Sequence, residues 1–256
     1  MHNRVVDGWR LAVGTLTILP VSPPRSVDRR VAGVAAVVSP IAFAPVALAA
    51  GLGGWGLARV LPVAVVALLM IGLVAWLTRA IHLDGLADTA DGLGSGRPAE
   101  RALEIMRRGD IGPMGVVTLI VVLGVQVASV AALAGRPWGW LAVATALAAG
   151  RGALVIAGRR GVPAARPDGL GAVFASSVPV VLAAGVWLFL ALALSVAAQL
   201  SAGRWWLGLL AAIAGATIAW CLVRTASQRL DGITGDVLGA SVEVATAGVL
   251  VVLTAG

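Results

Sequence analysis

The amino-acid sequence predicts an all-α, polytopic membrane protein that folds as one domain over residues 1–256. Hydrophobic residues make up 59% of the chain and charged residues only 12%, whereas a soluble domain carries about 25% charged residues. Seven apolar runs approach or exceed the roughly 20 residues that cross a bilayer as a helix. The arginines between these runs alternate between crowded and sparse segments. The sequence therefore predicts a membrane-embedded helix bundle with about seven transmembrane helices.

The predicted spans follow one another along the whole chain. They cover residues 31–51, 61–79, 114–134, 138–157, 177–200, 205–223 and 237–254. Residues 9–20 form a further apolar run that is too short to cross and is flanked by Arg10 and prolines. We expect that run to be an interfacial or re-entrant segment. No internal repeat of the kind found in many transporters is evident.

The distribution of charge predicts the orientation. The arginine-rich segments are residues 1–30, 79–113, 159–168 and 224–236. Each of the other connections between predicted spans holds a single arginine, and Arg151 lies within the fourth span. We expect the protein to lie in the plasma membrane, and the positive-inside rule predicts that its N-terminus is cytoplasmic. Every acidic residue except Glu243 also lies in these segments, so we expect a carboxylate-rich site that faces the cytoplasm. Lipid is the expected surrounding, and the absence of a basic soluble domain argues against nucleic acid as a partner.

The first motif is the run HLDGLADTADG at residues 82–92. Asp84, Asp88 and Asp91 are spaced i, i+4, i+7, which places them on one face of a helix. Like charges at this spacing repel one another, and a divalent cation that prefers oxygen ligands would compensate them. A solvated acidic helix start is the alternative. His82 faces away from the aspartates, and we do not expect it to bind metal.

The second motif is the basic segment of residues 97–115. Its arginines carry planar guanidinium groups that suit phosphate oxygens. An amphipathic surface helix with internal ion pairs, such as Glu104 with Arg108, is the alternative. We predict that Arg101, Arg107 and Arg108 contact phosphate.

The third motif is a glycine-rich turn that opens the last span, RLDGITGDVLGASVE at residues 229–243. Backbone N–H groups at such a helix start suit a phosphate, which makes Thr234 and Gly235 candidate phosphate-binding residues. Asp236 and Glu243 are seven residues apart and face the same way. Asp236 as a plain helix cap, and Glu243 as a structural partner of Arg151 or Arg224, are the alternatives. Arg151, within the fourth span, is either paired or near a phosphate, and residues 166–171 form a turn sequence.

These three motifs together resemble the cobalamin synthase family, the adenosylcobinamide-GDP ribazoletransferases. The resemblance rests on HLDGLADTADG at 82–92, LEIMRRGDIGPMG at 103–115 and TGDVLGASVE at 234–243, with fainter agreement at residues 16–21, 150–151 and 168–171. It implies an integral membrane enzyme that uses Mg²⁺, joins adenosylcobinamide-GDP to α-ribazole or its 5′-phosphate, and releases GMP. The chain departs from the family pattern at Arg108-Gly109-Asp110 and at Asp231-Gly232.

The resemblance and the motifs together predict the residues of the site. The predicted metal ligands are Asp84, Asp88, Asp91, Asp236 and Glu243. The predicted catalytic carboxylates are Asp91, Asp88 and Asp236. The predicted phosphate-binding residues are Arg101, Arg107, Arg108, Arg151, Thr234 and Gly235. Catalysis of phosphoryl transfer by such a site rests on positioning and charge stabilisation.

Three other classes of protein share part of this pattern. A CDP-alcohol phosphotransferase would need an Ala-Arg pair after its second aspartate and a fourth aspartate in register, and both are absent. A prenyltransferase also places aspartates around magnesium pyrophosphate, and a substrate panel separates it. A transporter would hold its carboxylates near the membrane midplane. The sequence is compatible with a homo-oligomer.

Overall fold

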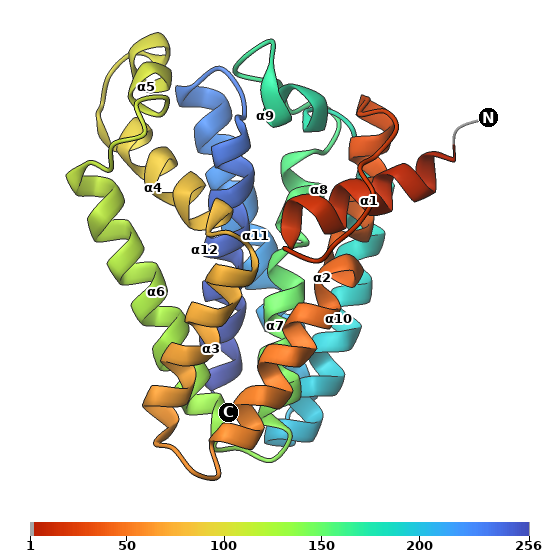
Figure 1. Ribbon diagram of the computed structural model, residues 1–256, viewed down its shortest axis with the longest axis vertical. Coiled ribbons are helices and arrows are strands. Elements are labelled where there is room, and N and C mark those ends of the chain that lie inside the picture. The colour runs from red at the N-terminus through yellow and green to blue at the C-terminus, as the bar shows by residue number, and fades with distance from the viewer. Residues whose placement is uncertain (1–2, 256) are drawn as a thin grey trace.

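The computed structural model describes residues 3–255, and within that range all regular secondary structure is helical. The longer helices run side by side along the long axis of the molecule (Figure 1). In chain order the helices are α1 (Arg4–Leu16), α2 (Arg29–Leu57), α3 (Val63–Leu77), α4 (Ile81–Gly94), α5 (Ala99–Ile105), α6 (Pro113–Ala134), α7 (Gly139–Gly150), α8 (Ala153–Ala157), α9 (Gly169–Phe174), α10 (Val180–Ala202), α11 (Trp205–Arg229) and α12 (Gly235–Thr254).

The predicted polytopic helix bundle is confirmed. Six segments of the described chain are long and apolar enough to cross a membrane: α2, α6, α7 together with α8, α10, α11 and α12. A seventh crossing is obtained if α3 and α4 are taken as one span, which bends by 91°. The bend explains why the second predicted span ends early and why the first motif forms a helix of its own.

The bend between α3 and α4 is built from strained backbone. Arg79 and Ala80 both adopt left-handed conformations, with φ of 54° each, a region that residues with a side chain rarely occupy. The Arg79 guanidinium donates to the carbonyl oxygens of Gly14, at 2.7 Å, and Thr17, at 3.2 Å. This side chain therefore ties the bend to the end of α1, which crosses the bundle near the same level (Figure 1).

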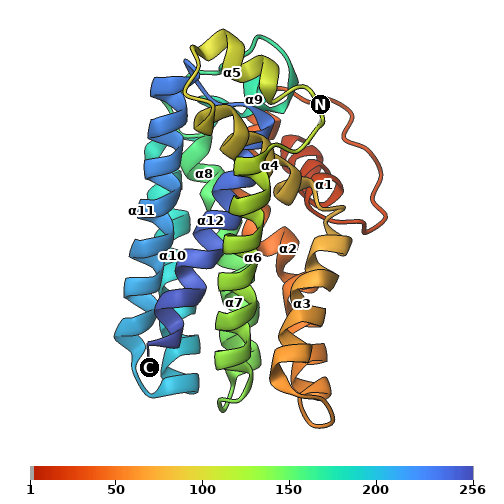
Figure 2. The ribbon, with the colours of Figure 1, turned by 90° about the vertical axis from the view of Figure 1, so that its left-hand side faces the viewer.

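The arginine-rich and arginine-poor segments separate to opposite ends of the bundle. Figures 1 and 2 show α5, α9 and the connection between α11 and α12 at one end. The connections from α2 to α3, from α6 to α7 and from α10 to α11 lie at the other end, near the C-terminus. We call the first of these the arginine-rich end. The alternation of charge along the sequence thus becomes a difference between the two ends of the molecule.

The last helix, α12, is the centre of the bundle. It packs against α4, α6, α7 and α11, and its side chains are mostly buried. The contact with α4 is backbone to backbone, because a Cβ atom added to Gly85 would lie 2.7 Å from the carbonyl oxygen of Asp236. This close approach brings the first and third motifs together at the arginine-rich end.

Candidate active site

The start of α12 forms the floor of the site. Thr234 is the N-cap residue, and its hydroxyl oxygen accepts a hydrogen bond from the backbone N–H of Val237 at 3.3 Å. The same hydroxyl donates to Oδ2 of Asp236 at 3.1 Å. Asp236 is only partly buried in the first turn, where the helix dipole favours a negative charge. The predicted residues Thr234, Gly235 and Asp236 therefore form one polar surface.

Two aspartates of α4 lie beside this surface. The carboxylate of Asp88 interacts electrostatically with those of Asp84, Asp236 and, more weakly, Asp91, and Asp236 in turn interacts with Asp84. Asp84 is exposed and Asp88 is half-buried. Three carboxylates that repel one another in a partly desolvated place are stabilised by cationic partners. We call Asp84, Asp88 and Asp236 the carboxylate cluster.

Asp91, the third aspartate of the motif, has its own partners. Its carboxylate oxygens accept hydrogen bonds from the backbone N–H groups of Gly112, at 2.7 Å, and Gly115, at 2.9 Å. A Cβ atom at either glycine would lie 2.5 Å from this carboxylate. Asp91 thus satisfies two free N–H groups at the start of α6, as a helix cap does. Both of its oxygens are engaged in holding α6 against α4.

The segment before α9 supplies the cationic partner, which the sequence prediction treated as a turn. The half-buried Arg166 interacts with the carboxylates of Asp88 and Asp236. Its guanidinium also donates to the carbonyl oxygen of Leu103 at 2.7 Å. Burial lowers the pKa of Arg166, and the neighbouring Arg107 lowers it further, while the surrounding carboxylates oppose this. The fainter family likeness at residues 168–171 was the only sequence signal for this segment.

Backbone pairing places Arg166 beside α12. The N–H of Ala165 donates to the carbonyl oxygen of Ile233 at 3.0 Å, and the N–H of Ile233 donates to that of Pro163 at 3.0 Å. Residues almost seventy positions apart are therefore fixed side by side. A Cβ atom on Gly171 would lie 2.7 Å from the Thr234 Cα atom, so α9 also packs directly on the start of α12.

A polar cavity of about 410 Å³ opens at this junction. It is lined by Arg107, Arg166, Asp168, Gly169, Leu170, Gly171, Thr234, Gly235 and Asp236. Arg107 lies 3.9 Å from Asp168 across exposed surface. Two guanidinium groups and a helix N-terminus form an environment that favours phosphate. We call this space the polar cavity.

The other predicted arginines lie outside the polar cavity. Arg101 is exposed on α5 and pairs with Glu104. Arg108 is exposed and does not contribute to the lining. Arg151 lies at the junction of α7 and α8, where its side chain is 1% exposed. Of the four predicted arginines, the structure thus brings only Arg107 to the cavity.

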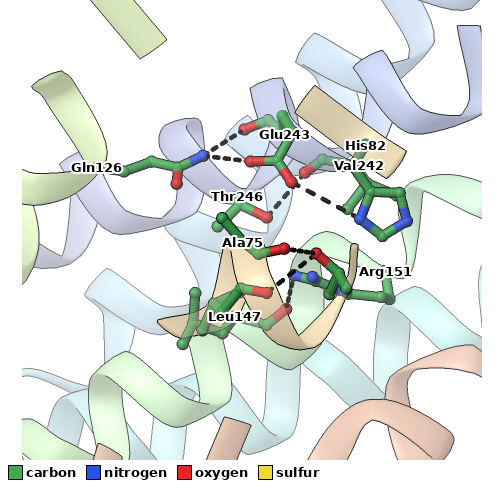
Figure 3. Close-up of polar contacts among 10 residues, drawn as sticks. Ala75, His82, Gln126, Leu147, Arg151, Val242, Glu243 and Thr246 are labelled. Carbon is green, nitrogen blue, oxygen red and sulfur yellow. Dashed lines mark hydrogen bonds and ion pairs between the residues drawn. The ribbon is translucent and has the colours of Figure 1, made fainter. Parts of the chain in front are cut away.

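Glu243 belongs to a second, buried group of polar side chains, which Figure 3 shows in close-up. Its Oε2 accepts a hydrogen bond from Nε2 of Gln126 at 2.8 Å, and its Oε1 lies 3.7 Å from Nδ1 of His82. Arg151 lies nearby: its guanidinium stacks 3.5 Å from the ring centre of Phe43 and donates to the carbonyl oxygen of Leu147 at 2.9 Å. We call His82, Gln126, Arg151 and Glu243 the buried cluster. Seven residues of helix, about 10 Å, separate Glu243 from Asp236.

The predicted five-carboxylate metal site is therefore divided among three environments. Asp236 lines the polar cavity and interacts with Asp84 and Asp88, Asp91 caps α6, and Glu243 is deep in the bundle. Within residues 3–255, no three His, Cys, Asp or Glu side chains converge closely enough to enclose a metal ion by themselves. A metal bound here would need ligands from water or substrate.

Comparisons with known proteins bear on the whole chain. The family model described as cobalamin-5-phosphate synthase matches residues 8–254. A protein of Nocardioides sp. (strain ATCC BAA-499 / JS614), named adenosylcobinamide-GDP ribazoletransferase, is 42% identical over 245 residues, which cover 95% of this chain and 96% of that protein. Proteins of the same name from Frankia casuarinae and Bradyrhizobium diazoefficiens are 36% and 39% identical, covering 95% and 93% of this chain and 93% and 89% of their own lengths. A comparison with the solved structures gave no match.

Proposed function

The chain belongs to the cobalamin-5-phosphate synthase family, and we propose that it transfers adenosylcobinamide phosphate from adenosylcobinamide-GDP to α-ribazole or α-ribazole 5′-phosphate, with release of GMP. The relatives are named for this activity, and the chain matches them over nearly their whole length. The chain is thus a transferase of cobalamin biosynthesis, and the identity of the donor and acceptor is the part we propose.

One observation carries the proposal: the polar cavity joins phosphate-binding groups to a carboxylate cluster. Arg107, Arg166 and the N-terminus of α12 form its basic part. Asp236 lines the same cavity, and Asp88 interacts with it. Cleavage of a pyrophosphate bond requires positive charge to stabilise the phosphate oxygens and a carboxylate to accept the proton of the attacking hydroxyl.

The carboxylate cluster fits Mg²⁺. This ion commonly binds proteins through one or two carboxylates and completes its shell with water and substrate phosphate oxygens. Asp84 and Asp236, which interact with each other, supply oxygen ligands of that number and kind, and Asp236 lines a cavity suited to phosphate. We propose that Asp84 and Asp236 hold Mg²⁺ together with water and substrate oxygens, and that the ion would neutralise charge on the pyrophosphate.

In the proposed reaction an acceptor hydroxyl attacks the phosphorus next to cobinamide. A new P–O bond forms, the bond from that phosphorus to the bridging oxygen breaks, and GMP leaves with the bonding electrons. Arg166 and Arg107 orient the phosphates and stabilise the leaving group. The hydroxyl proton passes to Asp88, whose carboxylate accepts no hydrogen bond within residues 3–255, unlike that of Asp91.

We also propose that the polar cavity faces the cytoplasm across the plasma membrane. The segments that hold most of the arginines lie at the end that carries α5, α9 and the start of α12 (Figure 2). The positive-inside rule assigns such an end to the cytoplasm. Labelling of a single cysteine introduced near Asp168, in intact cells and in inverted vesicles, tests this orientation.

The activity is tested by supplying detergent-solubilised protein with adenosylcobinamide-GDP and α-ribazole, with Mg²⁺ or with EDTA. We expect GMP and a cobalamin product in equal amounts with Mg²⁺, and neither with EDTA. Folded protein that makes no product would contradict the proposed donor and acceptor. A panel of CDP-alcohol and prenyl pyrophosphate substrates would then identify the alternative transferase.

A further inference from the structure

A second, apolar pocket adjoins the polar cavity. It has a volume of about 50 Å³, and Leu170 and Gly235 line both spaces. Its other walls come from the ends of α1 and α4 and from α8, α9 and α12. The side chains that define it are Leu16, His82, Leu154, Leu170, Phe174 and Leu238. We call it the apolar pocket.

We infer that the apolar pocket binds the methylated edge of the acceptor's aromatic base, while the sugar end of the acceptor lies in the polar cavity. The inference rests on the proposed function. Ribazole is a riboside of dimethylbenzimidazole, with an apolar planar base at one end and a polar sugar, or sugar phosphate, at the other. The two spaces have the same order of polarity, and they share a wall over which the sugar would pass.

The chemistry of the other reactant groups does not fit this pocket. The guanine of the donor carries hydrogen-bonding groups on most of its edge, and leaving these unpaired against leucine and phenylalanine would be costly. The corrin ring carries many amide groups and is far larger than the pocket. The pocket has room only for the edge of a small ring, and the methyl groups of ribazole lie on that edge.

His82 adds an aromatic, hydrogen-bonding side chain to the mostly apolar lining of the pocket. Its side chain lines the pocket, is 5% exposed and has no hydrogen-bond partner for Nδ1 within the described chain. That nitrogen lies 3.7 Å from Oε1 of Glu243 (Figure 3). The carboxylate thus constrains the imidazole ring from one side, and the side chain contributes an aromatic ring to the wall of the pocket. Stacking of aromatic rings is favourable in such a setting.

The position of the pocket also bears on reactivity. Gly235 and Leu238 lie on either side of Asp236 in the chain, on the first turn of α12. A base fixed against Leu238 would hold the attached sugar near the carboxylate cluster. Recognition of the base would then place the attacking hydroxyl as well as select the acceptor.

The inference is tested by measuring binding and turnover in the same variants. Leu238→Phe fills the apolar pocket, and Leu190→Phe is the matched control, because Leu190 is also buried and lines a separate groove of about 190 Å³ between α2, α7 and α10. Equilibrium dialysis with α-ribazole in the presence of Mg²⁺ gives the Kd without turnover. Thermal unfolding in detergent checks that each variant is folded.

We expect Leu238→Phe to raise the Kd and the KM for α-ribazole at least tenfold and to leave the KM for adenosylcobinamide-GDP within twofold. The control should change none of these values. Leu238→Phe should also reduce the preference for ribazole over the riboside of unmethylated benzimidazole. Phe174→Leu, which enlarges the pocket, should improve the use of an acceptor with a bulkier base.

Two results would overturn the inference: wild-type affinity for α-ribazole in folded Leu238→Phe protein, or no binding of α-ribazole by the wild type. Failure of the proposed function looks different. In that case the wild type would bind α-ribazole and lose affinity on Leu238→Phe, yet release no GMP from adenosylcobinamide-GDP. Such a result would support the apolar pocket as a base-binding site and would require another donor.

Discussion

The carboxylate cluster and the buried cluster are built on the same two helices, yet their surroundings differ. Both combine acidic residues of α12 with residues of α4, and each has an arginine close by. In the carboxylate cluster, Asp236 lines a cavity of about 410 Å³. In the buried cluster, Glu243 is 7% exposed and has a hydrogen-bond partner from α6. The presence of ionisable residues is therefore less informative about function than access to ligand and the lack of internal partners.

The comparison predicts its largest effect for Asp88 and Asp236. Asp88→Asn and Asp236→Asn should each lower kcat by about 10²–10⁴, because each change removes a proton acceptor or a metal-binding charge. The free energy of unfolding should change little or rise, since one member of a repulsive set is neutralised. Single-turnover release of GMP at saturating Mg²⁺ measures this, with the exposed Glu100→Gln as control. Near-normal turnover in both aspartate variants would show that neither Asp88 nor Asp236 takes part in catalysis.

A smaller effect is expected for the arginines of the arginine-rich end. Arg166→Ala should raise the KM for the donor about 10–100-fold, the loss expected for charge-assisted hydrogen bonds of about 1.5–3 kcal/mol. Arg166→Lys should recover part of this, because lysine keeps the charge but loses the planar fork. Arg108→Ala, at an exposed position outside the cavity, should leave the donor KM within twofold. Equal effects at the two positions would mean that surface charge, and not the cavity, attracts the donor.

Substitutions in the buried cluster should lower the free energy of unfolding more than they lower kcat. Glu243→Leu leaves Gln126 without its acceptor inside the bundle, which should cost about 1–3 kcal/mol of unfolding free energy. Glu243→Gln keeps an oxygen that can accept this bond and should cost less. Reversible unfolding in mixed micelles measures both variants, alongside kcat per folded molecule. If Glu243→Gln retained full stability but lowered kcat about a hundredfold, Glu243 would belong to the chemistry, as the sequence pattern had predicted.

Hydropathy and arginine count predicted most of the fold, because both reflect a physical constraint that acts along the chain. The bend at Arg79 and Ala80 could not be predicted, since two consecutive left-handed residues with side chains have no local sequence signal. The sequence also predicted that the first and third motifs lie close together, because both contain carboxylates suited to one metal site. The division of the carboxylates was not predicted, because helical spacing gives the direction of a side chain but not its partner.

Arg166 shows the same limit most clearly. Its segment is a plausible turn by local sequence, and only pairing with Ile233, far along the chain, places it at the polar cavity. The arginines of residues 101–108 were predicted to bind phosphate because of the chemistry of their guanidinium groups, which does not determine where the side chains lie in space. Proximity in space brought only Arg107 of that group to the cavity.

Asp91 offers the sharpest test with the smallest expected effect. Asp91→Asn retains one oxygen that can accept from Gly112 or Gly115, so the loss should be that of a weakened helix cap, about 1 kcal/mol. Turnover should fall by no more than about fivefold, the factor equivalent to that free energy. Asp88→Asn, three residues away on the same face of α4, is the matched comparison. If the two variants lost activity equally, Asp91 would act with the carboxylate cluster, and its hydrogen bonds to α6 would have to open when substrate binds. If only Asp88→Asn lost activity, the i, i+4, i+7 pattern would combine a catalytic pair with a structural cap.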